Sequence, residues 1–253
     1  MSEDAPNPYA PPAADLGREA APQSPVRFAF DAIWDSTVLR VLVLFALPIN
    51  WLWILALQRT DPTNWPAFLA INLVPALCAR PLYDGIALVA ASALATGGRA
   101  STRDLLVESL KAWPRLFTAH LLATAILLFG FLALVIPSLI LAVRCSLMPA
   151  AVFFARSSAP AACIRSFDLT NERFWPIARL LLAFGLPVFA ANVVASNAQE
   201  FIPLNLRTPT LTVVAVAVEI IASIGAAALA FVYLDSASKK ASVPPRMPEP
   251  LAN

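Results

Sequence analysis

Six long apolar stretches constrain this chain most, because each is long enough to cross a lipid bilayer as a helix. A helix rises about 1.5 Å per residue, so about 20 residues span the roughly 30 Å of hydrocarbon. The stretches lack the alternating period of the strands in a membrane β-barrel. We therefore expect an all-α fold, a polytopic membrane helical bundle with six transmembrane helices. The predicted spans are residues 38–57, 66–95, 116–136, 138–155, 176–195 and 209–234.

The composition supports a membrane protein. Hydrophobic residues make up 59% of the chain and charged residues 13%, whereas ordinary soluble domains are about a quarter charged. So few charges cannot cover a globular surface, which argues against a soluble enzyme or a nucleic-acid partner. The proline-rich residues 1–25 and residues 235–253 bury too little apolar area to fold, so we predict two disordered tails. Between them, residues 26–234 form the predicted membrane domain.

Two of the spans are irregular in the sequence. The second would be about 45 Å long as a single helix, and it contains Arg80, Pro81 and Asp84. Proline removes a helical hydrogen bond, so we expect a break or kink there. The third and fourth spans are separated only by Pro137 and Ser138, which predicts a tight hairpin at the membrane edge.

Lysine and arginine predict the orientation. If the six spans alternate, thirteen basic residues share the side of the N-terminus and only Arg59 and Arg207 lie opposite. Because cytoplasmic loops are enriched in basic residues, we expect both termini in the cytoplasm. Tryptophans favour the headgroup level, and all six lie near predicted boundaries. Those at inner boundaries are Trp34, Trp113 and Trp175, and those at outer boundaries are Trp51, Trp53 and Trp65.

A threefold repeat is a further expectation. A short amphipathic segment ending near a tryptophan precedes each odd-numbered span, at residues 26–37, 101–113 and 159–174. We interpret these as short cytoplasmic interfacial helices, each followed by a helical hairpin. The alternative is that basic amphipathic segments commonly precede membrane helices.

Four charged residues inside the spans are the candidates for chemistry, because a charge at the bilayer centre costs roughly 2.5–3.5 kcal/mol on insertion scales. Arg144 and Glu219 are predicted to lie within reach of each other, about 9 and 15 Å below the outer boundary. A structural ion pair, or an arginine reaching the headgroups, is favoured over a proton- or ion-coupled site. Arg80 and Asp84 are four residues apart and can neutralise each other on one helical face.

Few other residues suggest a reaction. His120 is the only histidine and there are three cysteines without paired spacing, so we predict no metal site and no disulfide framework. An interhelical hydrogen bond is the expected role of His120. The chain has no phosphate-binding loop and no dinucleotide fingerprint. We expect no cofactor and no catalytic activity.

Residues 134–182 resemble a family signature. A proline-led span with an internal arginine is followed by A-x-x-x-S, then L-T, a basic residue and tryptophan. The matching positions are Pro137, Arg144, Ala162, Ser166, Leu169, Thr170, Arg173 and Trp175. This resembles uncharacterised bacterial multi-pass proteins of the YciC type and the membrane domain fused to glycerophosphoryl diester phosphodiesterases. The stretch NPYAPP (residues 7–12) also resembles tails of proteobacterial inner-membrane proteins.

The resemblance implies a protein of the bacterial cytoplasmic (inner) membrane, and it implies no catalytic residues. Ser138 departs from the pattern, where the family commonly has glycine, which puts the geometry of the turn in doubt.

The predicted function is a membrane scaffold that binds lipids, with anionic headgroups favoured, or a protein partner, including a second copy of the chain. Basic residues on the cytoplasmic side are the candidate contacts for lipid or partner. These are Arg103, Lys111, Arg165 and Arg173. The alternative is a transporter or channel that uses Arg144 and Glu219.

Overall fold

The computed structural model describes residues 24–61, 63–133, 135–198 and 201–242, and these form α-helices without any strand. This confirms the predicted all-α class. The helices are α1 (Pro25–Ile33), α2 (Ser36–Arg59), α3 (Trp65–Ala95), α4 (Thr102–Ala133), α5 (Val135–Cys145), α6 (Met148–Ala155), α7 (Ala159–Ala198) and α8 (Leu204–Ser242).

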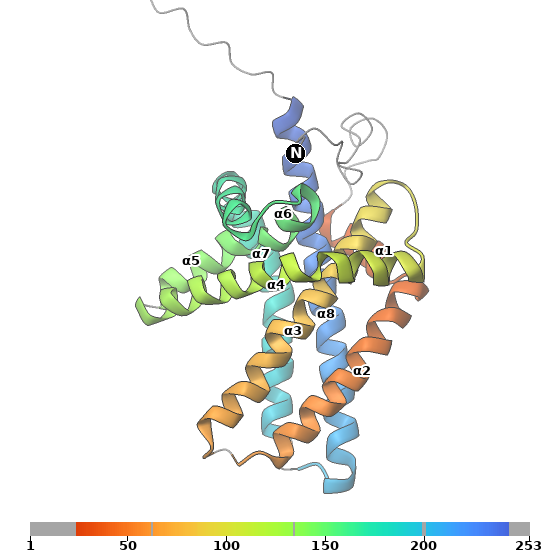
Figure 1. Cartoon of the computed structure of the whole chain (residues 1–253), viewed down its shortest axis with the longest axis vertical. Coiled ribbons are helices and arrows are strands. Elements are labelled where there is room, and N and C mark those ends of the chain that lie inside the picture. The colour runs from red at the N-terminus through yellow and green to blue at the C-terminus, as the bar shows by residue number, and fades with distance from the viewer. Residues whose placement is uncertain (1–23, 62, 134, 199–200, 243–253) are drawn as a thin grey trace, which may run out of the picture.

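The bundle is organised around helices that follow its long axis (Figure 1). α2, α3, the C-terminal part of α7 and α8 run along this axis, and the α4–α5 hairpin crosses them. In the described part of the chain, six helical segments are long and apolar enough to cross a membrane, with α5 and α6 counted as one. The protein is therefore a multi-pass membrane protein.

The predicted interfacial segments differ in how they join the spans. Ser24 accepts a hydrogen bond from the Arg27 backbone N–H and caps α1, and Asp35 caps α2 in the same way through Thr37. α7 is kinked at Arg173, whose φ of −130° and ψ of 28° are not helical. The first and third segments are thus separated from their spans as the repeat predicts. The second is continuous with its span, because α4 passes through Pro114 unbroken.

The predicted break in the second span is not found, because α3 continues through Arg80, Pro81 and Asp84. A proline in a membrane helix is tolerated where neighbouring helices satisfy the freed backbone groups. Trp113 of α4 donates a 2.8 Å hydrogen bond to the Cys78 carbonyl, within a turn of the proline. This contact with α4 supports the helix where the sequence suggested a break.

The fourth predicted span is the one that is divided. α5 ends at Cys145 and α6 begins at Met148, with a turn between them and Pro149 in the first turn of α6. α4 ends at Ala133 and α5 begins at Val135, slightly before the predicted Pro137–Ser138. A β-carbon on Gly130 would lie 2.7 Å from Leu141 Cδ1, so the absence of a side chain allows α4 and α5 to approach closely.

The predicted C-terminal tail begins too early. α8 continues to Ser242, so residues 235–242 are helical. Asp235 forms ion pairs with Arg173 of α7 and with Lys239 one turn later, which stabilises this extension. The rest of both predicted tails, residues 1–23 and 243–253, lies outside the described residues.

Candidate functional site

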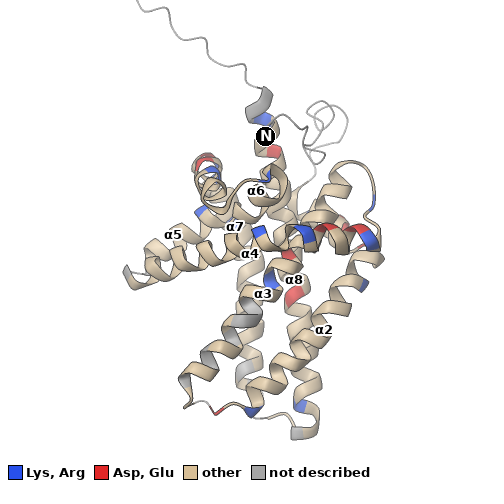
Figure 2. Ribbon diagram, in the orientation of Figure 1, with Lys and Arg blue, Asp and Glu red and all other residues tan. Residues whose placement is uncertain are grey.

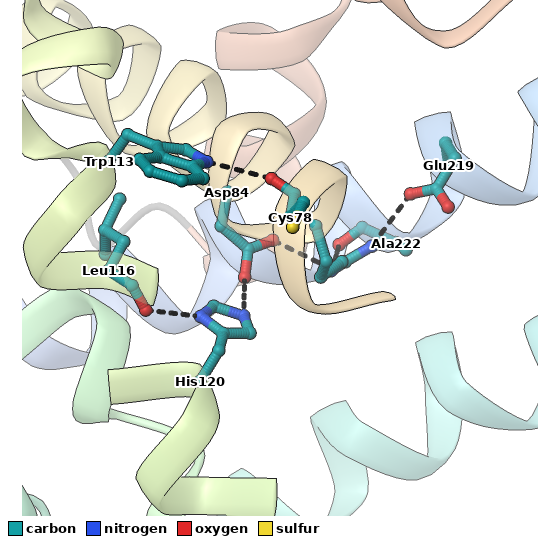
Figure 3. Close-up of polar contacts among 8 residues, drawn as sticks. Cys78, Asp84, Trp113, Leu116, His120, Glu219 and Ala222 are labelled. Carbon is teal, nitrogen blue, oxygen red and sulfur yellow. Dashed lines mark hydrogen bonds and ion pairs between the residues drawn. The ribbon is translucent and has the colours of Figure 1, made fainter. Parts of the chain in front are cut away.

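Four ionisable side chains from three helices form a polar cluster within the bundle. Arg80 of α3 lies at its centre, with Nη2 2.9 Å from Asp84 Oδ1 and Nη1 3.1 Å from Glu219 Oε2 of α8. Arg80 Nη2 also donates a hydrogen bond of 3.2 Å to the Ala222 carbonyl. One guanidinium therefore holds two carboxylates and the backbone of α8 (Figure 3).

His120 of α4 is the fourth member of the polar cluster. Its Nε2 lies 3.0 Å from Asp84 Oδ2, and its Nδ1 lies 2.9 Å from the Leu116 carbonyl oxygen. The expected interhelical hydrogen bond is thus confirmed, and its partner is a carboxylate. Asp84 is the most buried of the four, with 7% of its side chain exposed.

The contacts of His120 fix how many protons the cluster holds. A carbonyl and a carboxylate both accept hydrogen bonds, whereas a neutral imidazole has a single N–H to donate. Both contacts are satisfied only if the imidazole is doubly protonated or if Asp84 carries the proton. In either state, with Arg80 and Glu219 ionised as a pair, the polar cluster (Arg80, Asp84, His120 and Glu219) has no net charge.

A central cavity of about 300 Å³ adjoins the polar cluster. Arg80 and Asp84 line one part of it, together with Ser146. The rest of the wall is mostly apolar and comes from α3, α6, α7 and α8. It includes Leu88, Pro149, Leu181, Phe184, Ala226 and Leu229. This arrangement of an apolar wall with a few polar groups is typical of small-molecule sites.

A basic pocket lies between α4 and α6. It has a volume of about 230 Å³ and is lined by Lys111, Arg115 and Arg156, with Glu108 as the acidic residue. Val152 and Phe153 supply part of its apolar wall. Glu108 pairs with Lys111 at 2.8 Å. We call this the α4–α6 pocket.

A second basic pocket, the α7–α8 pocket, has a volume of about 560 Å³. Arg173, Arg179 and Lys239 line it, and Asp235 is its acidic residue. The apolar part of its wall includes Phe231, from α8. Both pockets therefore combine three basic side chains and one carboxylate with an apolar surface.

Most of the charged residues lie in the half of the bundle drawn at the top of Figure 2, and a few lie in the middle and at the opposite end. The top, which we call the charged end, is also the end at which α1 packs against the C-terminal part of α8, since Pro25 and Lys239 line the same pocket. The C-terminal end of α2 and the N-terminal end of α3 lie at the opposite end. The two basic pockets thus belong to the charged end.

The predicted pair of Arg144 and Glu219 is not formed. Glu219 pairs with Arg80, while the Arg144 guanidinium lies 5.7 Å from the centre of the Phe167 ring. The Ser166 hydroxyl donates to the Arg144 carbonyl. The reason is that the α4–α5 hairpin crosses the bundle, so residue counting along a straight span places Arg144 wrongly.

The structure brings only some of the predicted basic contacts together. Lys111 and Arg173 line the two basic pockets. Arg165 lies over the Tyr233 ring at 5.5 Å and Arg103 is exposed near the start of α4. The sequence analysis did not single out Arg115 or Arg179 as contacts, although each closely follows a tryptophan predicted at an inner boundary, Trp113 or Trp175.

Among the described residues, no group of three His, Cys, Asp or Glu side chains can hold a metal ion. Comparisons with protein families, curated proteins and solved structures found no match to this chain. The resemblance to the YciC type therefore stays a prediction.

Proposed function

We propose that this protein is a lipid-binding scaffold of the bacterial inner membrane, with both termini in the cytoplasm and no catalysis of its own. The observation that carries the proposal is the pair of basic pockets at the charged end of the bundle. The excess of basic residues predicts that this end faces the cytoplasm. Anionic phospholipids are therefore the ligand class that fits the pockets.

The chemistry of each pocket matches a phospholipid headgroup next to its acyl chains. Three basic groups against one carboxylate leave a surplus of positive charge for a phosphate, and each basic group near the surface contributes about 1 kcal/mol. Arg115 and Arg179 form no ion pair with any described residue. Their guanidinium groups are thus available for bidentate contacts with phosphate oxygens.

Exposed tryptophans support the same placement. Trp34 follows α1 and is 63% exposed, and Trp175 follows the kink in α7 and is 70% exposed. Indole rings favour the headgroup level of a bilayer. The same charged surface can hold a protein partner or a second copy of the chain. Counting bound lipids by native mass spectrometry distinguishes lipid binding from these two alternatives.

A transporter is the second candidate, and the central cavity beside the polar cluster favours it. The version that uses Arg144 and Glu219 together loses its support, because those residues are not paired. If the protein is a transporter, Glu219→Gln will abolish flux in proteoliposomes without lowering the amount of protein inserted.

Native mass spectrometry tests the lipid proposal. The purified protein is titrated with phosphatidylglycerol or with phosphatidylcholine of the same acyl chains, and bound lipids are counted. We expect phosphatidylglycerol to bind preferentially and Arg115→Gln with Arg179→Gln to remove that preference. Arg59→Gln, at the opposite end of the bundle, is the matched control. Equal binding of both lipids to the wild type would contradict the proposal.

A further inference from the structure

We propose that the central cavity binds a lipophilic ammonium ion in exchange for the proton held by the polar cluster. This concerns binding inside the bundle and is independent of the lipid-binding proposal. The charge balance of the polar cluster and its position at the cavity wall carry the inference.

The polar cluster is neutral only with its extra proton. Arg80 contributes one positive charge, Asp84 and Glu219 contribute two negative charges, and the shared proton on His120 or Asp84 restores neutrality. Loss of this proton leaves one uncompensated negative charge inside an apolar bundle, which is costly. A second cation in the same place removes that cost.

Asp84 is the group that a cation in the cavity would meet. It lines the cavity and is almost fully buried, with 7% of its side chain exposed. Its Oδ1 is paired with Arg80 Nη2 at 2.9 Å and its Oδ2 with His120 Nε2 at 3.0 Å, so an incoming ammonium group would take the place of the proton shared with His120. A carboxylate oxygen has room for further donors, and an ammonium group supplies three. Arg80 does not attract an anion into the cavity, because Asp84 and Glu219 already neutralise its positive charge.

The rest of the cavity suits an alkyl or aryl body. Leu88, Leu181, Phe184 and Leu229 form apolar parts of the wall, and the volume of about 300 Å³ lies at the lower end of the range for ligand pockets. Gly185 of α7 is exposed at the cavity wall. This side therefore offers an entrance from the lipid between α7 and the neighbouring helices.

The exchange is balanced in charge. One R–NH3⁺ enters and one H⁺ leaves, and no covalent bond of the ligand changes. The ionised groups that act on His120 are Asp84 and Arg80 of α3, with Glu219 of α8 beyond Arg80. Within its own helix, α4, the polar contact described for His120 is the one between Nδ1 and the Leu116 carbonyl oxygen. The proton is thus shared between His120 and the carboxylate that would pair with the ammonium.

Calorimetric titration of the protein in nanodiscs with n-octylamine tests the proposal, with empty nanodiscs as the reference. Octylamine, with a pKa near that of lysine, stays protonated between pH 6 and 8. We expect release of about one proton per bound ammonium at pH 6, measured in two buffers of different ionisation enthalpy. We also expect affinity to rise with pH, by up to about tenfold per unit while the cluster holds its proton.

Four variants make the test specific. Asp84→Asn should weaken binding at least tenfold and abolish proton release. His120→Asn keeps the carboxylate but removes the imidazole that shares its proton, so the pH at which binding strengthens should shift from that of the wild type. Ala226→Leu fills the cavity and should remove binding, whereas Ala217→Leu, on an exposed part of α8 outside the cavity, should not. Each variant is used only if it elutes as the wild type does from size exclusion.

Three outcomes would overturn the proposal. One is that n-octanol, which has the same chain and no charge, binds as tightly as octylamine, because the cavity would then accept any alkyl chain. Another is binding without proton release. The third is unchanged binding by Ala226→Leu, which would place the ligand elsewhere.

Discussion

Arg80 Nη1 lies 3.1 Å from Glu219 Oε2, joining α3 to α8 across 139 positions of the sequence. The same guanidinium pairs with Asp84, which in turn contacts His120 of α4. Three helices are therefore connected through one arginine. Its removal leaves Glu219 without its ion-pair partner and Asp84 with His120 alone, whereas removal of Glu219 leaves the Arg80–Asp84 pair in place.

Loss of Arg80 should consequently be more harmful than loss of Glu219. We expect Arg80→Met to lower the free energy of unfolding by roughly 3 kcal/mol, as for other broken buried ion pairs. Glu219→Gln keeps the shape and should cost about 1 kcal/mol. Unfolding in mixed micelles by SDS titration measures both. Equal losses for the two variants would contradict the central role of Arg80.

Arg144 offers a matched comparison, because it is also an arginine within a span. It has no ion pair with any described residue and lies over the Phe167 ring. We expect Arg144→Met to lower the unfolding free energy by about 1 kcal/mol or less, the size of a cation–π contact. A loss as large as that of Arg80→Met, in the same SDS titration, would count against the described position of Arg144.

The Trp113–Cys78 hydrogen bond should stabilise the contact of α4 with α3 near Pro81. Trp113→Phe keeps most of the ring and removes the N–H donor, so we expect a loss of about 1 kcal/mol. Amide hydrogen exchange should increase around residues 77–82. The exposed Trp175 is the control, since Trp175→Phe removes no hydrogen bond that the structure describes.

Asp35 gives α2 a pH-dependent cap. The Thr37 backbone N–H donates to Asp35 Oδ1 at 2.8 Å and holds the pKa of this carboxyl below its usual value of 3.8. Because the pKa is lower in the folded state, the stabilisation is complete above the usual pKa. It is lost as the pH falls through the lowered value.

We expect Asp35→Ala to cost about 1 kcal/mol at pH 7, with a smaller difference from the wild type below about pH 4. Asp35→Asn keeps an acceptor that does not titrate, so its cap should persist in acid. Thermal unfolding in detergent across pH measures all three proteins. An acid-insensitive difference between the wild type and Asp35→Ala would show that the cap does not titrate.

The spans were predictable because apolar length depends on local sequence alone. The partner of Glu219 was not, because the depth of a residue along a helix says nothing about which neighbour its side chain faces. Arg144 and Arg80 both lie within predicted spans, so either could have paired with Glu219. The α4–α5 hairpin crosses the bundle, and Arg80 is the arginine that pairs with Glu219. Pro81 illustrates the same limit, since a tertiary contact from Trp113 lies beside the expected break.

The carboxylate partner of His120 could not be predicted from the sequence. His120 lies 36 positions from Asp84, so no local motif joins them, and only the packing of α4 against α3 brings them together. The α8 extension has a similar cause, because Asp235 finds Arg173 on another helix. Long-range ion pairs of this kind depend on the packing of the bundle.

The most direct test of the proposed function is photo-crosslinking with a phosphatidylglycerol that carries a diazirine near its headgroup. After digestion, mass spectrometry locates the adducts along the chain. The two basic pockets predict adducts concentrated at residues 108–115 with 152–156, and at residues 173–183 with 231–239. A phosphatidylcholine probe should not show this concentration. Adducts spread evenly over the lipid-facing helices, with the same distribution for both lipids, would contradict the account.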